Sequence, residues 1–87
     1  MTDNSPTIEK HGDITCIRLG PELENLDEQA LDGIRAELLE AAAAADPPRI
    51  IVDLQYTNFF GSSFIEVLFR IWNRINGMPG GKFGISG

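Results

Sequence analysis

Residues 49–68, RIIVDLQYTNFFGSSFIEVL, join an apolar run, a short polar link and the beginning of an apolar helix pattern. The run at 50–52 has no polar alternation, which predicts a central strand that is covered on both faces. The link ends at Gly61, and apolar residues recur at helical spacing after Ser62. Small hydroxyl groups then lie at a helix N-terminus, where backbone N–H groups are free and the macrodipole is positive. We expect the functional site of the chain at residues 61–63.

The chain before this segment predicts a β-hairpin and then a helix. Residues 7–10 and 14–19 have strand composition and flank a turn at 11–13. In the second of these strands, odd-numbered residues share one face and even-numbered residues the other. Leucine, isoleucine and alanine then recur at helical spacing over residues 31–45, and two prolines end the pattern. A strand, a helix and a strand in this order imply a parallel pair with a right-handed connection.

The first helix has two candidate N-caps. Asn25 and Asp27 both carry side-chain oxygens that can accept hydrogen bonds from free backbone N–H groups. Asn25, followed three residues later by Glu28, resembles a capping box.

The second helix, predicted at residues 62–76, has apolar residues over an arc of roughly 200°, wider than the stripe of about 100° on a typical surface helix. The arc contains Phe64, Ile65, Val67, Leu68, Phe69, Ile71, Trp72 and Ile75. We expect Trp72 to belong to the core. Val67 and Phe69 lie at the two edges of the arc, where they face solvent, further chain or a partner.

The fold that these elements predict is a single α/β domain spanning residues 1–87. Residues 82–86 alternate and predict a last strand with Phe83 and Ile85 inward. The sheet is mixed, with about four strands and two helices packed on one face. The polar residues 1–6 are expected to be frayed.

Composition excludes several classes of protein. The net charge of −6 disfavours a nucleic-acid partner, which selects a basic face. The single cysteine, Cys16, excludes an internal disulfide. No signal peptide opens the chain and no apolar run approaches the ~20 residues that span a bilayer, so we expect a cytoplasmic protein without membrane insertion.

The sequence also argues against catalysis, metal binding and a cofactor. Gly61-Ser62-Ser63 follows a strand, but the G-x-S-x-G pattern of a nucleophile elbow is absent. A serine nucleophile needs a base, and the only histidine, His11, lies in the distant hairpin turn. One histidine and one cysteine form no metal-ligand spacing, and no phosphate-binding glycine motif occurs.

The order of elements and the segment around the two serines resemble the STAS domain family, which includes the bacterial anti-sigma factor antagonists. Residues 14–19 followed by Pro21-Glu22-Leu23-Glu24 look like the second strand of the family and its G-E-L-D turn. Residues 49–53 look like its central strand. Phe60-Gly61-Ser62-Ser63-Phe64-Ile65 looks like its F-[MI]-D-S-S-G-L motif, with Gly61 in place of the usual Asp and Phe64 in place of the usual Gly.

The resemblance implies a phosphoserine switch. Ser62 takes the position of the serine that a partner kinase phosphorylates, Ser63 is the second choice, and Glu24 falls where the family often has an acidic residue near that serine. The implied partner is an anti-sigma factor with serine kinase activity or another protein. The implied partner-binding residues are Glu24, Asn58, Phe60, Gly61, Ser62, Ser63, Phe64, Glu66, Val67 and Arg70.

Two alternatives remain open, one from the residues themselves and one from the resemblance. Ser62 or Ser63 is equally interpreted as a simple N-cap, with a contribution of ~1 kcal/mol. STAS-like domains also serve as scaffold subunits of signalling or lipid-transport complexes, and that role needs the helix surface without a phosphorylated serine.

The family normally continues beyond its last strand with a helix that packs on the sheet. The sequence is therefore interpreted as a shortened domain with exposed apolar surface, which favours a homodimer through the sheet or helix surface.

Overall fold

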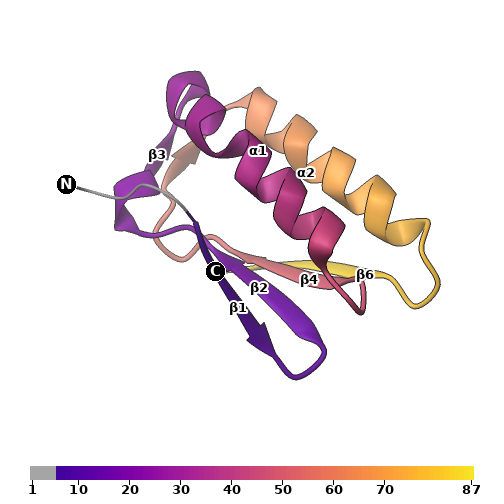
Figure 1. The fold of residues 1–87 in the computed structure, drawn as a ribbon. Helices are drawn as coiled ribbons and strands as arrows, with labels where there is room; N and C mark the ends of the chain where they lie inside the picture. Colours follow the sequence, from indigo (N-terminus) through magenta and orange to yellow (C-terminus); the bar gives the residue numbers. More distant parts are fainter. Residues whose placement is uncertain (1–5) are drawn as a thin grey trace.

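A computed structural model describes residues 6–87 of the chain (Figure 1). Its elements, in order, are β1 (Thr7–His11), β2 (Ile14–Arg18), a 3-10 turn η1 (Pro21–Leu23), β3 (Asn25–Leu26), α1 (Glu28–Ala44), β4 (Arg49–Asp53), β5 (Phe59–Phe60), α2 (Ser62–Asn76) and β6 (Lys82–Ser86). The predicted fraying of residues 1–6 falls mainly outside the described residues, and Pro6 is buried.

The main sheet has four strands in the order β1-β2-β4-β6. β1 runs antiparallel to β2, whereas β2, β4 and β6 are parallel to one another. Figure 1 shows α1 and α2 lying side by side over the same face of this sheet. The prediction of a mixed four-stranded sheet with two helices on one face is confirmed. None of the helices formed by residues 6–87 is long and apolar enough to cross a membrane.

Only one face of the sheet is covered, so the prediction that β4 is buried on both faces is wrong. Ile50 and Val52 are 1% and 0% exposed, whereas Ile51 between them is half-buried. The strands β2, β4 and β6 follow one another in the same direction across the sheet. Two right-handed crossovers in the same direction place both helices on the same side. In β2 the predicted alternation holds, since Thr15 and Ile17 are buried under the helices.

Helix α1 is capped by Asp27, whose Oδ1 accepts a hydrogen bond of 2.8 Å from the N–H of Ala30. The capping box with Asn25 does not form. Asn25 instead lies in the short strand β3, where it pairs in parallel with Phe59 of β5. Because the backbone of Asn25 is paired in a strand, Asn25 does not lie at the start of α1. Asp27 is therefore the residue that caps α1.

Helix α2 buries less of its apolar arc than its width suggests. Phe64 and Val67 are 0% and 2% exposed, so the expectation that Val67 lies at a solvent edge is wrong. Phe69 is 58% exposed, as expected, but Trp72 is 44% exposed and does not belong to the core. The helix lies between α1 and the edge strand β6, and no described element lies beyond β6 to cover that side.

The same edge position affects the last strand. Phe83 and Ile85 occupy the helix-facing side, because they pair in register with Ile50 and Val52. Phe83 is half-buried against the core, as expected, whereas Ile85 is 56% exposed and not inward.

Candidate functional site

The segment after β4 returns to the N-terminal ends of both helices. β5 pairs in parallel with β3, and the N–H of Gly61 donates to the carbonyl oxygen of Leu26 at 3.3 Å. This pairing brings the N-terminus of α2 next to the N-terminus of α1. We call this region, made of Glu24, Glu28, Asn58 and residues 61–63, the serine corner.

Gly61, not a serine, is the N-cap of α2. Ser62 is the first residue of the helix, is exposed, and makes no side-chain hydrogen bond to any of residues 6–87. The interpretation of Ser62 or Ser63 as a simple N-cap is therefore wrong. The exposed hydroxyl of Ser62 is left available to solvent or to a partner.

Ser63 points to the other helix. Its hydroxyl donates a hydrogen bond of 2.8 Å to Oε1 of Glu28, the first residue of α1. Glu28 thus supplies the carboxylate that contacts one of the two serines, Ser63. The local sequence predicts a capping-box role for Glu28. Its contact with Ser63 depends on the β3–β5 pairing, which has no signal in the local sequence.

Glu24 and Asn58 directly precede β3 and β5, the two short strands that lead into the serine corner. The side-chain amide of Asn58 donates to Oε1 of Glu24 at 3.0 Å, and the backbone N–H groups of Asn58 and Phe59 donate to the Glu24 carbonyl at 2.9 and 3.2 Å. The Glu24 carboxylate therefore binds this loop, whereas the carboxylate that contacts a serine hydroxyl is that of Glu28.

The remaining predicted contact residues divide into surface and core. Phe60 is 41% exposed and its ring tilts against that of Phe64, with centroids 5.6 Å apart. Glu66 and Arg70 are exposed and form an ion pair of 3.5 Å. Phe64 and Val67 are buried in the core, so in this structure their side chains offer no surface to a partner. Phe59, which sequence analysis did not select, is 56% exposed next to Phe60.

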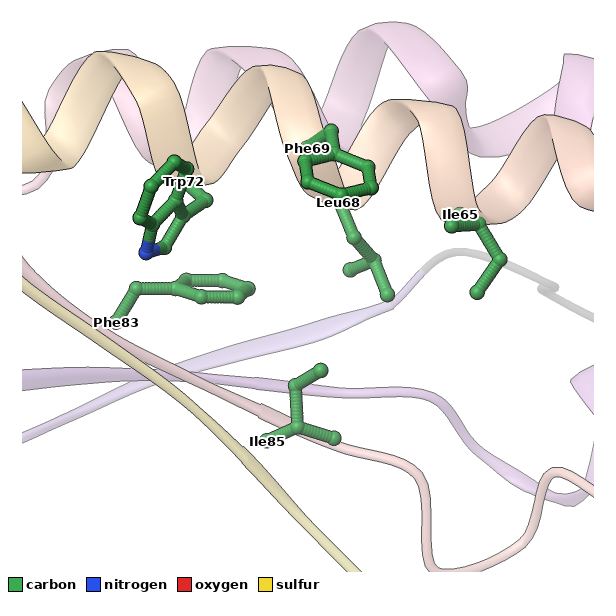
Figure 2. Close-up of a pocket in the computed structure, with 6 residues that line it drawn as sticks. All are labelled: Ile65, Leu68, Phe69, Trp72, Phe83 and Ile85. Carbon is green, nitrogen blue, oxygen red and sulfur yellow. The ribbon is translucent and has the colours of Figure 1, made fainter.

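A second candidate surface lies between α2 and β6. Side chains from both elements line an apolar cavity of about 300 Å³, which we call the α2–β6 groove (Figure 2). Its lining is Ile65, Leu68, Phe69, Trp72, Phe83 and Ile85. The apolar arc of α2 was the sequence signal for this groove, but only the edge position of β6 shows which part of the arc stays open.

The open face of the sheet carries an ion-pair network. Arg18 contacts Glu9 at 3.0 Å and Asp53 at 3.3 Å, and the hydrogen bond to Asp53 raises the pKa of the Arg18 guanidinium. Burial raises the pKa of the nearby Cys16 thiol, which lowers its thiolate fraction. His11 pairs with Glu9 at 3.3 Å, away from the serine corner. Within residues 6–87, no group of three or more His, Cys, Asp or Glu side chains is placed to hold a metal ion.

Comparison with solved structures finds a similar protein. The anti-sigma-factor antagonist (STAS) domain protein from Planctomyces limnophilus aligns with a TM-score of 0.87 and 32% sequence identity, over 93% of this chain and 69% of that chain. Comparisons with family models and with curated proteins give no match. The shared fold, the identity and the extent of the alignment show that this chain belongs to the STAS domain family.

Proposed function

We propose that this chain is a non-catalytic protein-interaction module that acts as an anti-sigma factor antagonist in the bacterial cytoplasm. In this proposal it binds an anti-sigma factor with serine kinase activity and so regulates transcription. Phosphorylation of Ser62 by that kinase releases the complex. The similarity to an anti-sigma-factor antagonist domain supports the class of function.

The observation that carries the proposal is the position of Ser62. Its hydroxyl is exposed at the first turn of α2 and is not used for capping. A phosphoryl group adds a charge of about −1.5 to −2 at this position. Free N–H groups and the positive end of the helix dipole favour such a charge, so the fold is expected to survive it. A partner that covers Ser62 then meets a bulky dianion in place of a neutral hydroxyl.

The proposed contact surface surrounds Ser62. It consists of the exposed or half-buried members of the predicted set, Glu24, Asn58, Phe60, Gly61, Ser63, Glu66 and Arg70. The exposed ring of Phe59 extends this surface, since aromatic side chains at the centre of an interface contribute strongly to affinity.

The test compares two substitutions at Ser62. Ser62→Asp should fold normally and lose partner binding, whereas Ser62→Ala should still bind. Binding is measured by calorimetry against the anti-sigma factor kinase, and folding by circular dichroism. Equal affinity of the Ser62→Asp chain and the wild type for the partner would refute the proposed phosphoserine switch.

A second candidate is a scaffold subunit without a phosphoswitch. The α2–β6 groove favours it, because an apolar cavity that remains open to solvent is suited to a lasting contact. The departures at Gly61 and Phe64 from the family motif point the same way. A second copy of the chain is a further candidate partner for this surface.

Kinase treatment separates the two candidates. The chain is incubated with the kinase and ATP, and its intact mass is measured. A phosphate that is lost in Ser62→Ala supports the switch. No added phosphate, together with partner capture that is lost on Phe69→Ser, supports the scaffold.

A further inference from the structure

A small cleft of about 120 Å³ lies between α1 and α2, beside the serine corner. Its lining includes Ser63 at one end and two arginines, Arg35 from α1 and Arg70 from α2. We call it the arginine cleft. Its other lining residues are Glu66 and Val67. Ser63 and two arginines from different helices therefore border one small cleft that is partly open to solvent.

We propose that the arginine cleft receives a phosphoryl group carried by Ser63, with Arg35 and Arg70 as its ligands. The cleft makes Ser63 a second modification site with an effect opposite to that of Ser62. A phosphate on Ser62 faces solvent and blocks a partner, whereas a phosphate on Ser63 ties α2 to α1. The proposal rests on the proposed function in one respect, which is that a serine kinase engages this corner.

The chemistry of the arginines suits a phosphate dianion. A guanidinium group presents paired N–H donors that match phosphate oxygens, and such charge-assisted hydrogen bonds are stronger than neutral ones. In the unmodified chain Arg35 pairs with Asp32 at 3.2 Å and Arg70 with Glu66 at 3.5 Å. All four side chains are 45% exposed or more, and exposed ion pairs contribute little. Each arginine can therefore exchange its carboxylate for a phosphate at small cost.

Repulsion by the Glu28 carboxylate favours placement of the phosphate in the arginine cleft. Glu28, which accepts the Ser63 hydroxyl, does not line the arginine cleft. On phosphorylation Ser63 loses its donor hydrogen, and the new dianion is repelled by Glu28. Glu66 is the acidic side chain that lines the cleft, and it is paired with Arg70. Asp32 does not line the cleft but is paired with Arg35.

The transfer step balances with a nucleoside triphosphate as donor. The Ser63 Oγ forms a bond to the γ-phosphorus of ATP held by the kinase. The bond between that phosphorus and the β–γ bridging oxygen breaks, and ADP leaves. The hydroxyl proton passes to Glu28, which already accepts it, and from there to water.

The test uses the full chain and no kinase, so its failure is distinct from failure of the Ser62 switch. Phosphoserine is incorporated during translation in place of Ser63 or, for comparison, in place of Ser62. The pH titration of the phosphate is followed by phosphorus NMR. Arg35→Gln and Arg70→Gln remove the ligands, and Arg74→Gln on the next turn of α2 serves as the matched control.

The phosphate at position 63 should titrate at lower pH than that at position 62, because nearby cations favour its dianion. The melting temperature of the chain that carries phosphoserine at position 63 should fall by about 4 °C or more when both Arg35 and Arg70 are replaced. Arg74→Gln should change neither value. A phosphate at 63 that titrates at or above the pH of that at 62, or that is insensitive to Arg35→Gln and Arg70→Gln, would overturn the proposal. So would loss of the folded state on phosphorylation of Ser63.

Discussion

Restoring the family residue at Phe64 should unfold this chain, although it brings the motif closer to the family pattern. Phe64 is 0% exposed and contacts the core from the first turn of α2. Truncation of a buried phenylalanine to alanine costs about 3–5 kcal/mol, through lost transfer free energy and the cavity that remains. Glycine in a helix adds about 1 kcal/mol relative to alanine. We therefore expect Phe64→Gly to lower the free energy of unfolding by about 4–6 kcal/mol.

This loss is comparable with the whole stability of a small domain, which lies near the lower end of about 5–15 kcal/mol. Gly61→Asp is the matched control, because it restores the other family residue. A Cβ at Gly61 would meet no atom within 4 Å, and an aspartate there can cap α2 with its carboxylate. Gly61→Asp should therefore be neutral or stabilise the chain by a few tenths of a kcal/mol.

Urea unfolding followed by circular dichroism measures both variants, with Phe64→Ala as an intermediate step. The order of stability should be Gly61→Asp at or above wild type, then Phe64→Ala, then Phe64→Gly. A loss of less than about 1 kcal/mol in Phe64→Gly would refute the assignment of Phe64 to the core, since full burial requires a larger cost.

Three further predictions concern other sites. Ser63→Ala should lower the free energy of unfolding by about 1 kcal/mol, because it removes the hydrogen bond to Glu28; equal chemical denaturation of the two chains would contradict this. If two copies of the chain associate through the α2–β6 groove, Phe69→Ser should reduce that association in sedimentation velocity while changing stability by less than about 1 kcal/mol, since Phe69 is largely exposed. Association that the substitution leaves unchanged would rule out the groove as the contact. Cys16 should react with iodoacetamide more slowly in the folded chain than in urea, and faster as pH rises, because its raised pKa lowers the thiolate fraction; equal rates would show that burial does not protect it.

The sequence predicted the main elements because each carries its own local pattern. The period of the apolar residues located both helices and the main strands, and Asp27 was one of two caps expected for α1. The order of the elements then determined the parallel pairing. The crossover rule also places both helices on one face, so the half-buried state of Ile51 followed from topology rather than from the apolar run itself.

The site was predictable only in part. The motif identified Ser62 and Ser63, but it could not predict that Ser62 is exposed whereas Ser63 donates a hydrogen bond to Glu28. That difference depends on α1, which is distant in the sequence. The contact between Ser63 and Glu28 joins residues that are 35 positions apart, and it depends on the short β3–β5 pair. Likewise, the exposure of Trp72 depends on the position of β6 at the sheet edge, which helical periodicity does not contain.

The most direct measurement of the Ser62 switch uses the Ser63→Ala chain, in which Ser62 is the remaining serine of the pair. This chain is treated with the anti-sigma factor kinase and ATP, its intact mass is measured, and its affinity for the kinase is determined before and after. The switch predicts the addition of one phosphoryl group at Ser62, an unchanged circular dichroism spectrum and loss of binding. A chain that carries the phosphate on Ser62 and still binds with equal affinity would contradict it.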